Sequence, residues 1–313
     1  MPKDEQVLAV KDALTSTRHE FIYRDSRTAP DTLIAALSAQ LPHLPMTSWE
    51  MRLASGGAYV NGKPATVDGP LPPTPFRIEY YEPKEGAHDK LFTALDPAWI
   101  IEQDREFIAI NKPPGLSCNQ AREQHTSHLR KLVEDYTGRQ AHLPSRLDTS
   151  ARGLVVISTA ARTHKLLQQV YERHEVEKFY LLAVSPAVNW KNKLVENRLD
   201  RDPRHPVLRR VVTEGGDSAV TQFSCIGNRD VAGVTASIIL ARPRTGRTHQ
   251  LRVQMSALGA PIIGDKFYAG APAPELHLLA IKIRFFDRGQ KAFREFKLRP
   301  QDLPTWVEPE WVL

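Results

Sequence analysis

The amino-acid sequence predicts an α+β fold, with a mostly antiparallel mixed sheet, a few flanking helices and a small α/β domain at the N-terminal end. Three observations support this. Short apolar runs of strand length recur after residue 99, with few amphipathic helical stretches between them. Residues 31–81 combine helical spacing with a strand–turn–strand pattern. The chain has 313 residues, which favours one large domain plus a smaller one.

Residues 31–81 are predicted to begin with two short helices. Apolar residues recur there at helical spacing: Leu33, Ile34, Leu37 and Leu41. Asp31 is the expected N-cap because it follows Pro30 and directly precedes the first apolar residues. A second short helix is predicted over 48–54, before two consecutive glycines.

The same unit is predicted to end with a β-hairpin and a closing strand. Asn61-Gly62 favours the tight turn that joins two antiparallel strands. Residues 76–80 alternate between apolar and polar side chains, as a half-buried strand does. We interpret residues 1–30 as an N-terminal extension and 82–98 as a linker, so that 99–313 forms the larger domain.

Residues 99–313 are predicted to contain one sheet. Its expected strands are 106–111, 153–159, 179–184, 219–225, 234–241 and 280–286. A helix is predicted over 160–174, where apolar side chains line one face. A second helix carries Leu251 and Met255 and is expected to end at Gly259, because glycine readily takes the left-handed conformation that ends helices.

The composition is that of a folded globular protein. A hydrophobic fraction of 41% and a charged fraction of 25% exclude a mainly disordered chain. The only cysteines, Cys118 and Cys225, cannot build a disulfide framework, which is typical of a cytoplasmic protein. No apolar run reaches the length of about 18 residues that suggests a membrane span, and the N-terminus lacks the apolar core of a secretory signal. We therefore expect a cytoplasmic protein.

The charge distribution favours a polyanionic partner. The formal net charge is +6, and arginines are concentrated in two stretches. These are Arg198, Arg201, Arg204, Arg209 and Arg210, and then Arg242, Arg244, Arg247 and Arg252. Clustered arginine suits contacts with phosphate groups, although solvated surface is the alternative.

Common cofactor motifs are missing from the sequence. There is no glycine-rich nucleotide fingerprint and no P-loop. His174-Glu175 is followed by Lys178 where a zinc-binding HExxH motif requires histidine, and His125 with His128 lacks an evident third ligand. We expect neither a metal nor a small-molecule cofactor.

Three segments can carry chemistry together. Ser145-Arg146-Leu147-Asp148 precedes a buried strand, although such an Arg-x-Asp pair is ordinarily a surface salt bridge. Lys178-Phe179-Tyr180 lies on the next predicted strand, and if the two strands are neighbours, Tyr180 reaches the same cleft; core packing is the alternative. The arginine-rich segment 242–252 runs into a helix N-terminus, which favours anions. One of its arginines can pair with a carboxylate and keep it ionised.

In their order and spacing these segments resemble the RluA family of pseudouridine synthases. The resemblance extends over about residues 100–300. It is carried by INKPPGL (110–116), RLD (146–148) with GL (153–154), KFY (178–180), GDSA (216–219), TGRTHQLRV (245–253), LG (258–259), PI (261–262) and GD (264–265). Residues 31–81 resemble the alpha-L type RNA-binding domain that often accompanies the family, through GAYVNGK (57–63).

The resemblance implies a cofactor-free isomerase, expected to be a monomer, that converts uridine to pseudouridine in ribosomal or transfer RNA. Asp148 takes the place of the family's nucleophile, and Tyr180 that of the residue facing uracil. Arg247 is our candidate for the cation that pairs with Asp148. Arg146 matches the arginine that fills the space left by the flipped base. Further RNA contacts are expected from Lys112, Arg244, His249 and Arg252.

The sequence departs from the family pattern at several positions and leaves two other functional classes open. The departures are Ser145 and Gln254 in place of histidines, Ala151-Arg152 in place of Thr-Ser, and Leu279 in place of another histidine. A catalytically silent RNA-binding or RNA-folding module is one alternative, which retention of Asp148, Tyr180 and Arg247 disfavours. A hydrolase or nucleosidase is the other, and it lacks a second carboxylate that can be placed beside Asp148.

Overall fold

The computed structural model describes residues 16–44, 46, 49–54, 57–83, 92–119, 128–202 and 208–312. The chain divides into two compact units, Met1–Asp89 and Lys90–Leu313. Within the described residues no helix is both long enough and apolar enough to cross a membrane. Much of the predicted linker lies outside the described residues.

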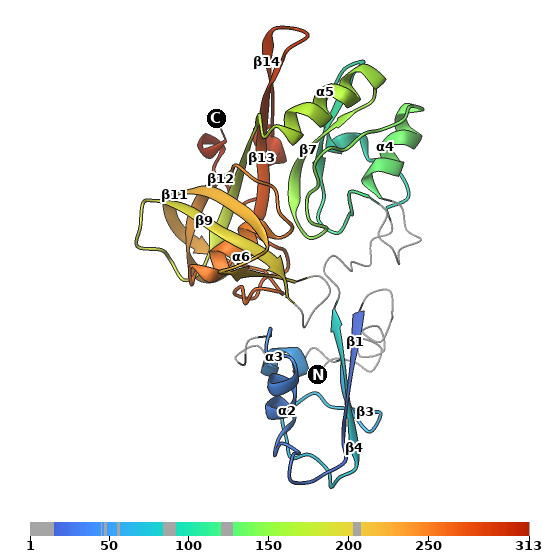
Figure 1. The fold of residues 1–313 in the computed structure, drawn as a ribbon, viewed down its shortest axis with the longest axis vertical. Helices are drawn as coiled ribbons and strands as arrows, with labels where there is room; N and C mark the ends of the chain where they lie inside the picture. Colours follow the sequence, from blue (N-terminus) through green and yellow to red (C-terminus); the bar gives the residue numbers. More distant parts are fainter. Residues whose placement is uncertain are drawn as a thin grey trace. The chain divides into compact units, whose positions relative to one another are not determined.

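In its described residues the small unit is a four-stranded sheet with two helices (Figure 1). The strands run in the order β1 (Ser16–Tyr23), β4 (Phe76–Pro83), β2 (Ala58–Val60) and β3 (Lys63–Pro64), and the helices are α2 (Leu33–Gln40) and α3 (Trp49–Ala54). Asn61 and Gly62 both have positive φ angles, of 49° and 75°, which confirms the predicted tight turn. Helix α2 is capped by the Thr32 side chain, which accepts a hydrogen bond from Ala35 N, so the prediction of Asp31 as the N-cap is wrong.

Residues 1–30 are not merely an extension. Strand β1 pairs with β4 over its whole length, from Ser16 opposite Pro83 to Tyr23 opposite Phe76. Without β1, strand β4 would present an unpaired edge. Arg18 on β1 strengthens the pairing by donating to the buried carboxylate of Glu79 at 2.7 Å. The prediction that residues 1–30 lie outside the small domain is therefore wrong for residues 16–23, which form β1.

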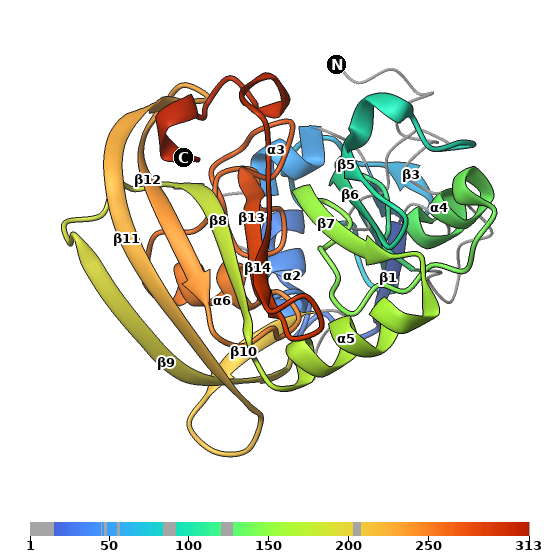
Figure 2. The same ribbon diagram turned by 90° about the horizontal axis from the view of Figure 1, so that it is seen from above.

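The large unit is built on one ten-stranded sheet, which confirms the α+β prediction (Figures 1 and 2). Its strands run in the order β10, β9, β11, β12, β8, β13, β7, β6 and β5. Strand β14 pairs with the C-terminal part of β13, from Lys282 to Asp287. The bounds are β5 (Ile100–Gln103), β6 (Phe107–Lys112), β7 (Arg152–Ser158), β8 (Val176–Val184), β9 (Asn192–Arg201), β10 (Arg209–Val212), β11 (Asp217–Val231), β12 (Val234–Pro243), β13 (Leu278–Asp287) and β14 (Ala292–Lys297). Only the β13–β7 pairing is parallel among the described pairs.

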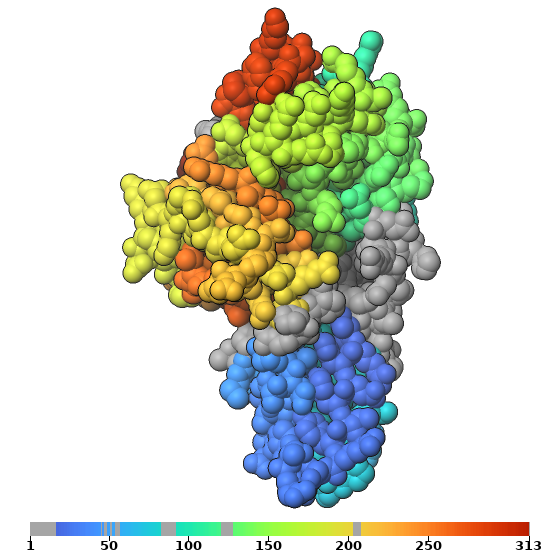
Figure 3. Space-filling model, in the orientation of Figure 1, coloured from blue at the N-terminus to red at the C-terminus, as the bar shows by residue number. Residues whose placement is uncertain are grey.

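Three helices flank this sheet. Helices α4 (Leu129–Thr137) and α5 (Ala161–Glu172) lie beside the half that contains β6 and β7, and α6 (Gln250–Ala257) lies with the half that contains β9 to β12 (Figures 1 and 2). Gly259, just beyond α6, has a φ angle of 74°, as expected for a residue that ends a helix. Short 3-10 turns follow at Pro300–Asp302 and Pro309–Trp311. The β13–β14 hairpin projects from the unit in the space-filling view (Figure 3).

Strand β13 lies between β7 and β8, so the strands that carry the first two predicted motifs are not neighbours. Ala280 on β13 is opposite Gly153 on one side and Tyr180 on the other. A side chain at Gly153 would place its Cβ 2.4 Å from Ala280 O, and the φ angle there is 121°. Glycine is thus required where β7 approaches β13. Asp148 lies five residues before Gly153, in the segment that leads into β7.

Candidate active site

The loop that carries Asp148 rests on a buried lysine. Lys112, at the end of β6, is fully buried, and its ammonium donates to Pro113 O and Leu116 O at 2.9 Å each and to Thr149 O at 3.2 Å. A buried charge is tolerated when such hydrogen bonds surround it. These bonds join the turn after β6 to the residue that follows Asp148. The prediction that Lys112 contacts RNA is therefore wrong, because its ammonium is buried in the protein.

Asp148 is held by an arginine from helix α6. Arg252 Nη1 donates to Asp148 Oδ2 at 3.3 Å, and the guanidinium also forms a two-pronged pair with Asp265, at 2.7 Å from Nε and 2.6 Å from Nη2. The Asp265 carboxylate accepts two further hydrogen bonds, from the backbone N–H groups of Phe267 and Tyr268. The Arg252 side chain is 2% exposed and that of Asp148 is 24% exposed. Arg252 is thus held in place by Asp265. Of its two carboxylate partners, Asp148 is the one that solvent can reach.

This arrangement corrects three predictions. Arg252 cannot make the predicted RNA contact, because it is buried between two carboxylates. Arg247 is not the cation at Asp148, since it donates to Ser218 O at 3.0 Å and lies 3.9 Å from Asp217. The third prediction was that no second carboxylate can be placed beside Asp148. The carboxylate of Asp265 does lie near it, because Arg252 contacts both. It is fully buried and already hydrogen-bonded, so it does not form the pair of exposed carboxyl groups that glycoside hydrolysis ordinarily uses.

A buried polar network positions helix α6. Gln254 accepts a hydrogen bond from Thr221 Oγ1 at 2.6 Å and donates to Asn197 Oδ1 at 3.1 Å. Gln250 donates to Thr221 Oγ1 at 2.9 Å and accepts from Thr245 Oγ1 at 2.8 Å. Buried amides that use both their donor and acceptor atoms fix a single arrangement. Gln254, one of the departures from the family pattern, thereby ties the helix that carries Arg252 to strands β9 and β11.

Tyr180 lies close enough to Asp148 for the two to interact electrostatically. Burial raises the pKa of Tyr180, and nearby Tyr171 and the charge of Asp148 raise it further. Tyr171, on α5, forms a side-chain hydrogen bond with Ser145, another departure from the family pattern. The predicted adjacency of their strands is wrong, because β13 separates β7 from β8, yet Tyr180 and Asp148 still influence each other electrostatically.

Lys178 shares a face of β8 with Tyr180, because side chains two residues apart on a strand point the same way. Its ammonium donates to Thr245 O at 3.2 Å, in the turn that leads towards α6. Burial lowers the pKa of Lys178 to about 8. This lysine thus links the strand that carries Tyr180 to the segment that carries Arg252.

His249 is the residue before α6 and is buried beside the same carboxylate. Its Nε2 atom lies 4.0 Å from Asp148 Oδ2, and its Nδ1 atom is 2.9 Å from the hydroxyl of Tyr268. The expectation of a surface RNA contact does not fit this position. Tyr268 was not singled out from the sequence, although it follows the recognised Gly264-Asp265 pair by three residues.

Two of the predicted RNA-binding arginines are exposed. Arg146 and Arg244 are both exposed, and among the described residues no ion pair or side-chain hydrogen bond holds the guanidinium of Arg146. The neighbouring backbone is anchored, because Leu147 N donates to the buried Cys118 Sγ at 3.4 Å. Arg146 is thus an exposed cation on an anchored loop, two residues from Asp148.

The first arginine cluster also comes to the site. Strands β9 and β10 form a two-stranded ribbon that packs on the active-site helix and on the segment after Asp265. The contact is made by buried apolar side chains: Leu199, Leu208, Ala219, Val253, Phe267 and Tyr268. Arg201, opposite Arg209, and Arg210, opposite Asp200, are both exposed on these strands.

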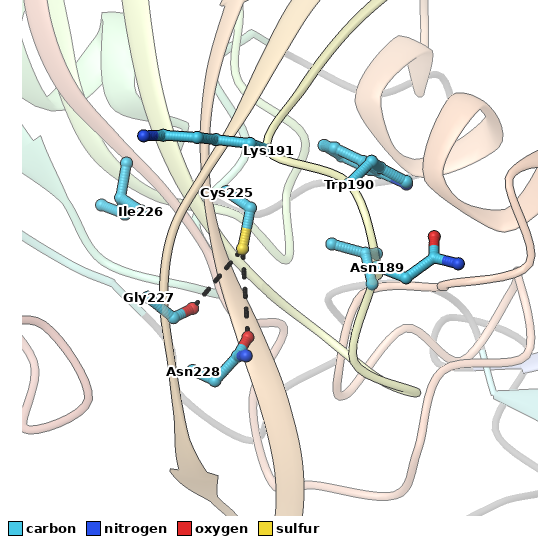
Figure 4. A pocket seen from close by; sticks show the side chains of 8 residues that line it. Asn189, Trp190, Lys191, Cys225, Ile226, Gly227 and Asn228 are labelled. Carbon is cyan, nitrogen blue, oxygen red and sulfur yellow. Dashed lines mark hydrogen bonds between the residues drawn. The ribbon is translucent and has the colours of Figure 1, made fainter.

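Other features do not add to this cluster. Among the residues that the model describes, no group of three or more histidine, cysteine, aspartate or glutamate side chains is arranged to hold a metal ion. A hollow of about 390 Å³ lies between residues 188–191 and 225–228, with Trp190 and Lys191 on one wall (Figure 4). Its lining includes none of the residues around Asp148.

Comparisons with known proteins agree with the motifs. Residues 106–257 match the family model described as RNA pseudouridylate synthase. The chain is 33% identical over 195 residues to the dual-specificity RNA pseudouridine synthase RluA of Vibrio vulnificus, which covers 60% of this chain and 77% of that protein. It is 33% identical over 186 residues to the protein of the same name from Escherichia coli, covering 59% and 81%.

A solved structure has the same fold. The structure of human RNA pseudouridylate synthase domain containing 1 aligns with a TM-score of 0.57 and 21% sequence identity, over 64% of this chain and 83% of that one. At this identity the likeness concerns the fold alone.

Proposed function

The chain belongs to the RluA family of RNA pseudouridine synthases, and from this premise we propose that Asp148 is the nucleophile with which it isomerises uridine in a structured ribosomal or transfer RNA. The observation that carries the proposal is the pairing of a partly exposed Asp148 with a buried Arg252. A nearby cation favours the ionised form of a carboxyl group, and a nucleophile must be ionised to attack. The arginine also aims the carboxylate towards the solvent side.

The reaction needs no oxidant and no external group. The Asp148 carboxylate forms a bond to the nucleoside, the bond between the base nitrogen and the ribose breaks, and the base turns; a bond then forms between carbon 5 and the ribose, and the bond to Asp148 breaks to regenerate the free carboxylate. Carbon 5 loses one proton and the released nitrogen gains one, so atoms and electrons balance. Tyr180 is proposed to contact the uracil and to assist the loss of the proton from carbon 5. Burial raises the pKa of Tyr180, so in the free enzyme it is a neutral phenol that can pack against an uncharged base.

The target base must leave the RNA stack before it can reach Asp148. Unstacking costs roughly a few kcal/mol. We propose that Arg146 enters the vacated space, because it is exposed on an anchored loop two residues from the nucleophile. Phosphate contacts from Arg201, Arg210 and Arg244 offset part of the cost. A structured RNA offers both a stack to enter and phosphates on either side of it.

Tritium release tests the proposed reaction directly. We expect the protein to release label from RNA that carries tritium at carbon 5 of uridine, without cutting the chain or freeing uracil. A silent RNA-binding module would bind this RNA and release nothing, and a nucleosidase would free labelled uracil. Either result would overturn the proposed function. Transcripts of ribosomal and transfer RNA, assayed in parallel, identify the class of RNA.

The role of Arg146 gives a prediction about substrate structure. Arg146→Ala is expected to lower kcat/KM on a folded stem-loop by about tenfold more than on a short unstructured strand, because only the folded RNA pays the full unstacking cost. Arg244→Ala is the matched control, since it removes an exposed arginine that is not on the Asp148 loop. Equal losses on both RNAs for Arg146→Ala would mean that this arginine contacts phosphate only.

A further inference from the structure

A chain of polar contacts leads from the arginine-bearing ribbon to Asp148. The backbone N–H of Arg209, on β10, donates to the Tyr268 hydroxyl at 2.9 Å. The same hydroxyl lies 2.9 Å from His249 Nδ1. On the other side of the imidazole ring, Nε2 faces Asp148 Oδ2 at 4.0 Å.

The imidazole ring is held in one orientation. His249 is stacked on the ring of Phe267, with an interplanar angle of 27°, and meets the ring of Tyr268 edge-on at 86°. Its backbone takes a left-handed conformation, with a φ angle of 55°, which is uncommon for residues other than glycine. The ring therefore presents Nδ1 to Tyr268 and Nε2 to Asp148 through packing that does not depend on the protonation state.

The hydrogen bond with Tyr268 can select one tautomer of this ring. A tyrosine hydroxyl has one proton to donate, and towards Arg209 N–H it acts as the acceptor. If its own proton is directed to His249, Nδ1 must be the unprotonated nitrogen. The ring proton then lies on Nε2, because a neutral imidazole carries one proton.

The electrostatics of the carboxylate favour the same tautomer. An Nε2–H group pointing at Asp148 is attracted by the negative oxygen, whereas a lone pair in that position would be repelled. The distance of 4.0 Å is longer than a hydrogen bond, so the interaction in the free enzyme is one of orientation and charge. Catalytic contacts commonly shorten when substrate closes the site.

We propose that Tyr268 is a positioning residue that holds His249 as the neutral Nε2–H tautomer, so that a fixed donor faces Asp148 in addition to Arg252. This inference rests on the proposed role of Asp148 as nucleophile. Arg252 supplies the positive charge, and His249 supplies a second donor without adding another charge. Because the contact to Tyr268 comes from β10, the ribbon that carries the arginines also supports the donor.

Nitrogen-15 NMR of the histidine rings tests the tautomer without any assay of activity. In the wild-type protein we expect His249 to give a pyridine-type Nδ1 signal and a pyrrole-type Nε2 signal, assigned by their loss in His249→Gln. Tyr268→Phe keeps the ring contacts but removes the hydroxyl, and the His249 signals are expected to move towards a mixture of tautomers. A pyrrole-type Nδ1 in the wild-type protein, or unchanged signals in Tyr268→Phe, would overturn the proposal.

Kinetics provide the second measurement. Tyr268→Phe is expected to lower kcat by about tenfold, with KM changed by less than about twofold, because one supporting hydrogen bond is lost and no RNA contact is removed. Tyr23→Phe is the matched control, since it removes the hydroxyl of another buried tyrosine, which accepts from Gln40 at 3.3 Å. We expect this control to retain wild-type kcat.

A pair of substitutions keeps the test independent of Tyr268. His249→Gln can place an amide donor near the position of Nε2, whereas His249→Asn places it near Nδ1. The glutamine variant is expected to retain at least about fivefold more kcat than the asparagine variant. Equal loss in both variants would contradict the need for a donor at Nε2. Failure of the nucleophile assignment is separate, because it would appear as an active Asp148→Asn enzyme while the NMR result stood.

Discussion

Asp148→Asn is expected to lower pseudouridine formation by more than about a thousandfold, because it removes the nucleophile and leaves an isosteric neutral amide. The substitution lies at a partly exposed position, so the fold and RNA affinity should remain close to those of the wild type. Tritium release measures the activity, and thermal unfolding and RNA binding are measured on the same samples. Clean Asp148→Asn protein that retains more than about a hundredth of wild-type activity would contradict the assignment.

Asp217→Asn is the matched control for this experiment. It neutralises a carboxylate of the same kind on β11, which is 71% exposed and lies 3.9 Å from Arg247. An exposed ion pair at such a distance contributes little to stability or geometry. We therefore expect near-wild-type tritium release from Asp217→Asn. The comparison separates the loss of the nucleophile from a general effect of lowering the negative charge.

Arg252→Met is expected to cost both activity and stability. It removes the cation at Asp148 and leaves Asp265 buried without its ionic partner, which typically destabilises a protein by about 3–5 kcal/mol. Tritium release is expected to fall by at least about a hundredfold, because the carboxylate loses both its orientation and its counter-charge. Arg247→Ala is the control from the same segment. It removes a partly exposed arginine bonded to Ser218 O and should leave stability within about 0.5 kcal/mol of the wild type.

A double substitution separates the two effects of Arg252. Asp265→Asn retains an oxygen that can accept from Phe267 N and Tyr268 N, while it removes the buried charge. Arg252→Met combined with Asp265→Asn is therefore expected to regain part of the lost stability and none of the lost activity. Chemical denaturation and tritium release are the measurements. Recovery of activity together with stability would show that Arg252 serves the fold only.

The sequence identified the segments of the site more reliably than the contacts within it. The loop with Asp148, the strand with Tyr180 and the helix after Arg247 were all recognised, and in the structure Arg252 of that helix contacts Asp148. Choosing Arg247 as the paired cation was wrong, because sequence alone did not give the direction of each side chain around α6. All residues from Gln250 to Met255 are buried, so this short helix has no polar face from which an exposed arginine could be told apart.

Some strands could not be predicted from periodicity, because too few of their side chains are buried to give an alternating pattern. Strand β9 reads NKLVENRLDR, and of its residues only Leu199 is fully buried. Strand β1 is stabilised by pairing with β4 and by ion pairs such as Arg18–Glu79. No local sequence pattern predicts these contacts. Lys112 was misjudged for a similar reason. A lysine is ordinarily exposed, and the carbonyl groups that converge on it, which the sequence does not reveal, make its burial favourable.

The place of β13 in the sheet has a consequence for the newly made chain. This strand covers Leu278–Asp287, yet it lies between β7 and β8, which are translated more than ninety residues earlier. Until β13 leaves the ribosome, β7 and β8 have no bridge between them, and Asp148 and Tyr180 belong to separate halves of an open sheet. Long-range pairing of this kind slows folding and leaves strand edges exposed. A nascent chain that ends before residue 278 should therefore be inactive and should bind chaperones. RNA modification then begins only once β13 has been synthesised.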